Sequence, residues 1–171
     1  VSYNDFLVRA AALGIKEFPM MNNSWTPQGI KVNKGINIGI VVSLEEEGML
    51  IPVIKNTDTK GLVELAGIVK DLAEKTRAHH LKPDEFSGGT FTISNLGMFD
   101  IENFIAVIYP GESAILASGR MADKPGVKAG QIVIRPILTL TLSSDHRIID
   151  GAQAAMFMKD LIGRLENCRF E

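Results

Sequence analysis

His146 is the residue of this chain whose setting best suits proton transfer. Asp150 follows it by four positions, and Gly151 comes next. Histidine is the side chain whose ordinary pKa suits acid–base work near neutral pH, and a carboxylate close by can fix the orientation and tautomer of its ring. Aspartate–glycine pairs also mark ordinary turns. Taken alone, the spacing is therefore more typical of a turn beside a hydrogen-bonded histidine.

The apolar run before this motif indicates where the histidine lies. Residues 136–142 read PILTLTL, which is typical of a buried strand. His146 therefore falls where a strand ends and a loop begins. Loops held by a rigid sheet are where catalytic side chains tend to be placed.

A second segment brings hydroxyl and amide groups to the end of a predicted strand. Residues 90–94 alternate like a strand that ends at Ser94 and Asn95, with Gly97 just beyond and two glycines at 88–89 before it. Glycines allow a backbone to approach a ligand closely, so Asn95 and Gly97 are expected to contact a cofactor. The alternative is a β-bulge or turn in which the Ser94 hydroxyl bonds to local backbone.

Composition excludes several classes of protein. The 171 residues fit one domain, and 46% of them are apolar, enough for a substantial core. The net charge is −2 with scattered lysines and arginines, which argues against a nucleic-acid partner. No run approaches the roughly 18 apolar residues of a membrane span, and no signal peptide is evident. With Cys168 as the single cysteine, neither a disulfide nor a cysteine zinc site can form within one chain.

The remaining pattern predicts one mixed sheet covered by helices, an α/β chain of the α+β type. Amphipathic spacing indicates three helices, and β-branched runs separated by turn residues indicate the strands. Helices are expected at residues 4–13, 61–80 and 152–165, strands at 30–32, 36–44, 49–54, 90–94, 114–118, 132–134 and 136–143, and loops at 22–27 and 124–130.

Two motifs in this order carry a family resemblance. Residues 88–97 read GGTFTISNLG and residues 145–152 read DHRIIDGA. Together they resemble the catalytic domain of the E2 components of 2-oxoacid dehydrogenase complexes, the dihydrolipoamide acyltransferases related to chloramphenicol acetyltransferase. The similarity extends over the whole chain through residues 5–12, 37–39 and 48–54. It implies a chloramphenicol acetyltransferase-like sandwich that forms trimers.

The resemblance also implies a reaction and roles for three residues. The family transfers an acyl group between the thiols of dihydrolipoamide and coenzyme A. His146 matches the general base, Ser94 the hydroxyl that donates to the oxyanion, and Asp150 the residue that holds the loop around the histidine. Asp145 and Arg147 are expected to form structural ion pairs. No metal is expected, and Cys168 has no expected role in the chemistry.

Assembly and location follow from the same resemblance. Family trimers place the active site between subunits, so His146 would meet Ser94 of a neighbouring chain. Trimers build a larger core that binds E1 and E3 components, in the cytoplasm of bacteria or archaea or in the mitochondrial matrix. Residues 1–171 are expected to be the catalytic domain without roughly its first fifty to sixty residues. The lipoyl group would then be carried on a domain that is absent from this chain. The subunit-binding domain would be absent as well.

Two departures and two alternatives remain open. The end of the chain, residues 166–171, is shorter and more polar than is usual in the family, and the segment 109–112 differs from the usual asparagine- and proline-rich stretch. One alternative is an O-acyltransferase that uses the same base on a hydroxyl, and the other is a catalytically silent core subunit. The GGTFTIS stretch argues against the first, and the intact His146, Ser94 and Asp150 argue against the second.

Overall fold

A five-stranded mixed sheet organises the computed structural model, which describes residues 1–44 and 47–170. The strand order is β6-β3-β7-β8-β9, in which β3, β7 and β8 run parallel while β6 and β9 lie antiparallel at the two edges. The strands are β3 (Ile38–Ile40), β6 (Val53–Ile54), β7 (Phe91–Asn95), β8 (Ala114–Lys128) and β9 (Gln131–Ser144).

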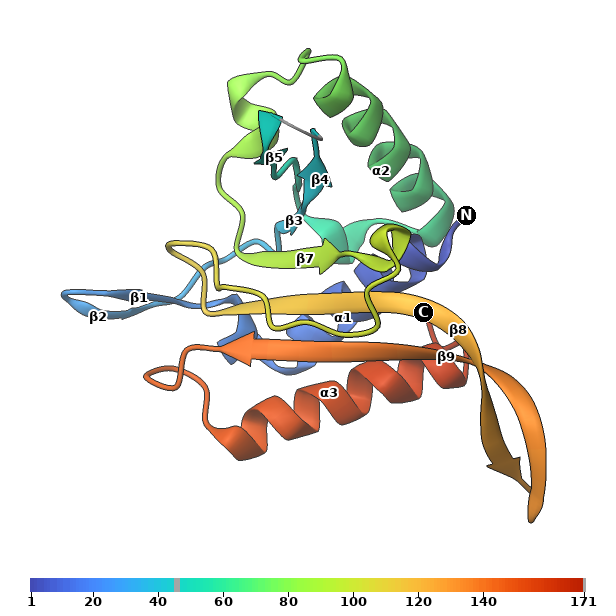
Figure 1. Ribbon diagram of the computed structural model, residues 1–171. Coiled ribbons are helices and arrows are strands. Elements are labelled where there is room, and N and C mark those ends of the chain that lie inside the picture. Colours follow the sequence, from blue (N-terminus) through green and yellow to red (C-terminus); the bar gives the residue numbers. More distant parts are fainter. Residues whose placement is uncertain (45–46, 171) are drawn as a thin grey trace.

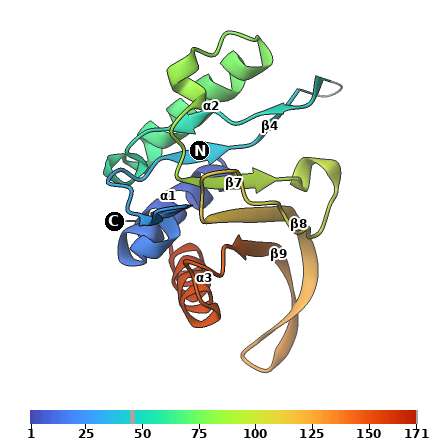
Figure 2. The ribbon, with the colours of Figure 1, turned by 90° about the vertical axis from the view of Figure 1, so that its left-hand side faces the viewer.

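Three helices lie on one side of this sheet (Figure 2). They are α1 (Tyr3–Glu17), α2 (Leu62–Arg77) and α3 (Gly151–Glu166), and α1 packs against both of the others. Ser2 and Asp5 form a capping box that begins α1. The core lies between these helices and the sheet, where the ring of Phe157 meets that of Phe91 edge-on at 5.9 Å. The predicted mixed sheet with helical cover is thus confirmed.

Shorter elements complete the chain. The strands predicted at residues 36–44 and 49–54 pair antiparallel with each other, divided into a β3–β6 pair and a β4–β5 pair. Residues 45–46 of its connection lie outside the described residues. The short elements are β1 (Ser24–Thr26), β2 (Gly29–Lys31), β4 (Val42–Ser43), β5 (Met49–Leu50) and the 3₁₀ turns Pro19–Asn22, Thr57–Thr59, Pro83–Phe86 and Gly97–Phe99.

The prediction of a plain loop at residues 22–27 was wrong. Part of this segment forms β1, which pairs with β2 so that Trp25 faces Ile30. The Thr26 hydroxyl donates to the carbonyl of Gly29 at 2.8 Å and closes the turn. The asparagines and the proline of this stretch indicate a turn, but they do not exclude a short strand on either side of it.

The predicted loop at residues 124–130 was also wrong. Strand β8 continues to Lys128, and only Ala129 and Gly130 form the turn, both with positive φ as a type I′ hairpin requires. The strands expected at 132–134 and 136–143 are one strand, β9. Beyond the sheet, β8 and β9 project as a two-stranded arm (Figure 1). Pro125 and Pro136 are tolerated there because the outer edge of each arm strand needs no ladder partner.

The face of the sheet away from the helices is crossed by the segment 100–111, which runs in front of β8 (Figure 1). The backbone N–H of Arg120 donates to the carbonyl of Ile101 at 2.7 Å, and the Ser143 hydroxyl donates to that of Ala106 at 2.7 Å. A Cβ atom at Gly119 would stand 1.8 Å from the Glu102 carbonyl oxygen, so only glycine allows this approach. The segment is therefore held closely against β8 and β9.

Candidate active site

His146 lies in a short turn between the end of β9 and the start of α3. Its side chain is exposed, whereas Ile148 and Ile149 are 5% and 0% exposed and anchor the turn in the core. The N–H groups of both isoleucines donate to the carbonyl of Asp145, at 3.0 and 2.9 Å. The backbone N–H of Asp145 donates to the carbonyl of Ser113 at 2.8 Å. An accessible imidazole is thus presented on a firmly attached loop.

Charged neighbours brace the same turn. Arg147 donates to both carboxylate oxygens of Asp145, with a shortest distance of 2.6 Å, which confirms the predicted structural ion pair. These hydrogen bonds hold the pKa of the Asp145 carboxyl below its ordinary value. The guanidinium of Arg147 also lies over the ring of Trp25, 4.9 Å from its centroid. The β1–β2 hairpin, which sequence reasoning missed, therefore supports the histidine turn.

Asp150 serves as the N-cap of α3. Its carboxylate accepts the backbone N–H of Gln153 at 2.8 Å, and the Gln153 side chain accepts the N–H of Asp150 at 3.2 Å. This reciprocal pair satisfies two N–H groups that a helix start leaves free. No hydrogen bond joins the described side chains of Asp150 and His146. Asp150 acts on the histidine turn through the start of α3.

Ser94 lies near the end of β7 and is 7% exposed. Its neighbour Ile93 packs into the core under the helices. Because side chains alternate along a strand, Ser94 points to the opposite face, which the segment 100–111 crosses. Thr92 shares that face. A hydroxyl in this position is shielded from water.

Within one chain, Ser94 and His146 lie far apart. Ser94 is in register with Ala117, and Ala117 with Thr141, whereas β9 continues to Ser144 before the histidine turn. At roughly 3.3 Å per residue along a strand and about 4.8 Å between strands, Ser144 already lies about 10 Å along and about 10 Å across the sheet from Ser94. β7 and β9 end at opposite sides of the sheet (Figure 1). The two groups cannot form one site within a single copy.

The side chain of Asn95 is engaged within its own chain. Its amide nitrogen donates to the Tyr3 hydroxyl at 2.6 Å and to the Asn4 side chain at 2.5 Å, and its oxygen accepts the N–H of Gly97 at 2.7 Å. A Cβ atom at Gly97 would come within 2.9 Å of the Gly119 carbonyl, which explains the glycine. These contacts tie the end of β7 to α1 and to β8.

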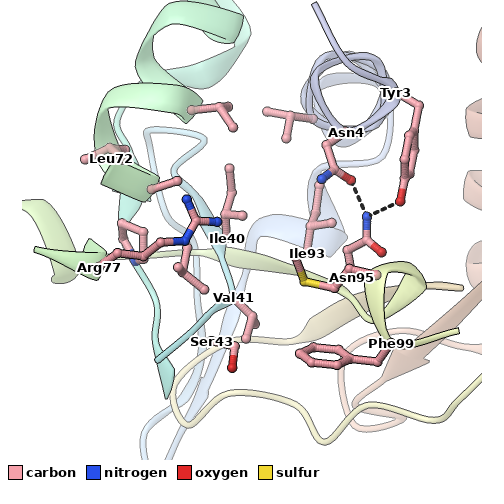
Figure 3. Close-up of a pocket in the computed structure, with 16 residues that line it drawn as sticks. Tyr3, Asn4, Ile40, Val41, Ser43, Leu72, Arg77, Ile93, Asn95 and Phe99 are labelled. Atoms are coloured by element: carbon pink, nitrogen blue, oxygen red, sulfur yellow. Dashed lines mark hydrogen bonds between the residues drawn. The ribbon is translucent and has the colours of Figure 1, made fainter. Parts of the chain in front are cut away.

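Asn95 forms part of the wall of a cavity of about 430 Å³ on the helix side of the sheet. Figure 3 shows the Tyr3–Asn4–Asn95 hydrogen bonds at one end of it and the Arg77 side chain at the other. Apolar side chains of β3, β7 and α2 form the walls between them. Since Ser94 points to the other face of β7, this cavity and the candidate catalytic hydroxyl lie on opposite faces of the sheet.

One buried carboxyl beside the candidate site was not predicted from the sequence. Glu112 precedes β8, is 6% exposed and lies against Thr92. Burial raises the pKa of the Glu112 carboxyl to about 7. Strand alternation could have placed Thr92 with Ser94, but no local signal marks Glu112 as buried, because its burial depends on how the turn at 109–112 folds back on the sheet.

Residues 1–44 and 47–170 contain neither a cluster of metal-ligating side chains nor a helix that could span a membrane. In this part of the chain, no group of three or more histidine, cysteine or acidic side chains is placed to hold a metal ion. None of the helices described is long and apolar enough to cross a membrane.

Comparison with known proteins identifies the family. A model of the catalytic domain of 2-oxoacid dehydrogenase acyltransferases matches residues 1–170. The chain belongs to this family. Two members of the family have been named as acetyltransferase components of pyruvate dehydrogenase complexes. The Rickettsia felis protein is 41% identical over 158 residues, and a mitochondrial Arabidopsis thaliana protein is 42% identical over 169 residues.

The chain covers only part of those relatives. The two alignments include 92% and 97% of this chain but 38% and 31% of the relatives' own lengths. In the solved structures of the family, the match to this chain covers most of the length of the solved chain. The cubic core of a pyruvate dehydrogenase complex superposes with a TM-score of 0.92 at 38% identity, covering 99% of this chain and 70% of that one. Chloramphenicol acetyltransferase, at 17% identity and a TM-score of 0.59, shares the fold over 96% of this chain and 78% of its own.

One family structure bears on the candidate residues. The dihydrolipoamide acetyltransferase of Azotobacter vinelandii is 37% identical, with a TM-score of 0.92 over 99% of this chain and 70% of that one. In that enzyme, the catalytic roles of a serine, a histidine and an asparagine were investigated. The histidine follows the serine by fifty-two positions and the asparagine follows the histidine by four. Ser94, His146 and Asp150 have the same spacings in this chain.

Proposed function

We propose that this protein transfers an acyl group, acetyl in the first instance, between the thiols of dihydrolipoamide and coenzyme A. The observation that carries the proposal is the set of Ser94, His146 and Asp150, whose types and spacing match those studied in the Azotobacter enzyme, apart from aspartate in place of asparagine. Aspartate and asparagine are about equally good helix N-caps, so the exchange preserves what Asp150 does at the start of α3.

His146 is assigned the role of general base. Thiols are mostly protonated at neutral pH, whereas the thiolate is the nucleophile. The imidazole takes the proton as sulfur attacks the thioester carbonyl. The ordinary pKa values of a thiol and an imidazole differ by about two units, so this proton transfer costs roughly 3 kcal/mol. When the tetrahedral intermediate collapses, the carbon–sulfur bond to the first thiol breaks and the imidazolium returns the proton to that sulfur. Both substrates supply their own sulfur, so no acyl-enzyme is formed.

Ser94 is assigned the role of oxyanion donor. Attack on the carbonyl carbon leaves a negative charge on oxygen, and a hydroxyl held in place stabilises it most where water is excluded. The position of Ser94 beneath the segment 100–111 meets that condition. Asp150 keeps the histidine turn in place by capping α3.

The separation of Ser94 and His146 within one chain supports a site between copies. In a cyclic trimer, the end of β7 in one chain and the histidine turn of the next could face the same cleft. The projecting arm favours association, because Val127, Ile132 and Ile134 are 71%, 80% and 80% exposed on one face of an otherwise unsupported ribbon. An isolated two-stranded ribbon is only marginally stable in water, and burial of this face against another copy would stabilise it.

Membership of the family also supports a larger assembly. We infer that trimers of this chain build the core of a 2-oxoacid dehydrogenase complex, with lipoyl groups delivered by a domain outside these residues and with E1 and E3 components as partners. The cubic core among the matching structures supports this inference. Bacterial cytoplasm and the mitochondrial matrix are the compartments that this role implies.

An acceptor and donor panel tests the proposal. Acetyl-CoA, succinyl-CoA and a branched-chain acyl-CoA are offered with dihydrolipoamide, and acyl-dihydrolipoamide is measured. We expect transfer to the thiol with acetyl-CoA preferred, and a loss of about 10² to 10⁴ in kcat for His146→Ala. His80→Ala, which changes an exposed histidine after α2, is the matched control and should keep the wild-type rate.

Three results would contradict the assignment. Full activity of His146→Ala would remove the general base from the reaction. Transfer to an alcohol acceptor in preference to dihydrolipoamide would favour an O-acyltransferase, and complete inactivity of a correctly assembled wild-type core would favour a silent scaffold.

A further inference from the structure

Glu112 carries a carboxyl group that is buried at the start of β8. The residue is 6% exposed, and its backbone N–H donates to the carbonyl of Tyr109 at 3.0 Å in the turn before the strand. Its Oε2 atom has no hydrogen-bond partner among the described residues. Moving a polar group out of water without giving it a hydrogen-bond partner costs free energy. Buried polar atoms without partners are uncommon in folded proteins.

The hydroxyl of Thr92 on β7 faces this carboxyl. Thr92 is fully buried, and its Oγ1 atom lies beside the Glu112 carboxyl without reaching good hydrogen-bond geometry or finding another partner among the described residues. On the same side, a Cβ atom at Gly89 would stand 2.9 Å from Glu112 Oε1, so the glycine makes room for the carboxyl. A protonated carboxyl can donate its O–H to the hydroxyl oxygen, which would satisfy both groups.

The charged groups nearby do not neutralise a carboxylate at this position. Lys55 donates to the carbonyl of Ser87, and Asp145 and Arg147 pair with each other. Desolvation has the largest effect on the pKa of the Glu112 carboxyl and raises it, whereas the Thr92 hydroxyl lowers it by less. Burial therefore raises the pKa of the Glu112 carboxyl from 4.5 to about 7.

Glu112 adjoins both segments of the candidate active site. Thr92, which its carboxyl touches, shares a face of β7 with Ser94, two residues further along. The next residue after Glu112 is Ser113, whose carbonyl accepts the backbone N–H of Asp145 at 2.8 Å, immediately before His146. A change in the charge of this carboxyl would thus be felt by the strand with the hydroxyl and by the turn with the imidazole.

We propose that Glu112 is a positioning residue whose uncharged carboxyl, hydrogen-bonded to Thr92, holds β7 and the histidine turn in the arrangement that acyl transfer requires. When the carboxyl loses its proton, a negative charge is left buried against β7, and acyl transfer is impaired. The catalytic part of this inference rests on the proposed function, whereas the protonation of the carboxyl does not.

Thermal unfolding as a function of pH tests the protonation. The folded state binds the Glu112 proton more tightly than the unfolded state, so wild-type stability falls as the pH rises from about 4.5 to about 7 and the loss is constant above that range. Glu112→Gln, which is neutral at every pH, should lack this loss. Glu17→Gln, at the exposed end of α1, should follow the wild type. Parallel curves for wild type and Glu112→Gln would overturn the proposal.

The pH profile of transfer tests the positioning role. The ratio of kcat for Glu112→Gln to kcat for wild type should rise several-fold through one proton step near pH 7, because all other groups are common to the two proteins. Thr92→Val removes the partner of the uncharged carboxyl, so it should lower kcat below pH 7. It should also move the step to higher pH, because the same hydroxyl can donate to the carboxylate and lowers the pKa of Glu112. A pH-independent ratio would make Glu112 merely structural. If wild type transfers no acyl group, the proposed function and the positioning role both fail, and the unfolding curves alone decide the protonation.

Discussion

The hydroxyl of Ser94 is small, shielded and held on a strand, which distinguishes it from the exposed serines of the loops. It lies on the face of β7 that the segment 100–111 crosses, and two ion pairs, Arg120 with Asp100 and Lys124 with Glu102, fasten that segment to β8. A donor in such surroundings needs little reorganisation when charge develops on a substrate oxygen. Its contribution should therefore appear in the chemical step.

Replacing this hydroxyl should separate binding from catalysis. Ser94→Ala is expected to lower kcat by about 10² to 10³, the usual effect of losing one oxyanion donor, with little change in KM. Ser87→Ala, at an exposed position before β7, is the control. Steady-state kinetics with acetyl-CoA and dihydrolipoamide measures both variants. A rise in KM at unchanged kcat would assign Ser94 to substrate binding.

At the residue scale, the sequence carried the catalytic candidates but not their surroundings. The motifs marked Ser94, His146 and Asp150 because family resemblance preserves residue types and order. They could not show that Trp25 supports Arg147, or that Glu112 meets Thr92, because both contacts join residues that are distant in the sequence. Such pairings depend on the tertiary fold.

Helix α3 and the histidine turn behave as one element. Asp150 caps the helix with one carboxylate oxygen, and the two buried isoleucines just before it fill the core. The cap, the core contacts and the Asp145 hydrogen bonds all lie within a few residues of His146. Weakening the start of α3 should therefore loosen the base as well as the helix.

Two substitutions at Asp150 separate the cap from the charge. Asp150→Ala removes the acceptor of the Gln153 N–H and should lower the free energy of unfolding by about 1 kcal/mol, with a fall in kcat. Asp150→Asn keeps an acceptor and should stay within a few tenths of a kcal/mol of wild type. Chemical denaturation and steady-state kinetics supply the measurements. Equal effects of the two substitutions would show that the charge, and not the cap, is what matters.

The strands show why sequence patterns predicted some elements and not others. The helices and β7 have the periodicity expected of half-buried elements and were predicted to within a few residues. The arm formed by β8 and β9 is neither buried nor regular in pattern, and Pro125, Gly126 and Pro136 resemble loop residues. Only the cross-strand register, Pro125 with Ile134 and Asp123 with Pro136, shows that they belong to a ladder.

At the scale of the molecule, the candidate base and the candidate donor lie at opposite ends of one sheet. The separation follows from topology, since β9 runs antiparallel to β7 and β8. A site between copies reconciles this geometry with the shared chemistry. In a cyclic trimer, each cleft would take its histidine from one chain and its serine from the next.

Mixing two inactive variants tests that arrangement. His146→Ala and Ser94→Ala should each be nearly inactive alone. Co-expressed with different tags and purified as mixed trimers, they should recover about a third of the wild-type sites, because in each mixed trimer one cleft of the three takes an intact histidine from one variant and an intact serine from the other. The acyl-transfer rate of the mixed trimers is the measurement.

The double variant is the control for this experiment. Chains with both substitutions, mixed with either single variant, should recover nothing. No recovery in the mixture of single variants would place both groups of a site in the same chain.

The antiparallel course of β9 has a genetic consequence. Because every chain would serve two clefts, a copy defective in both residues would silence two of the three reactions in its trimer while contributing one third of the mass. Inactivating alleles of this kind should behave as partly dominant in cells that also make the intact protein, whereas alleles that only prevent folding should be recessive.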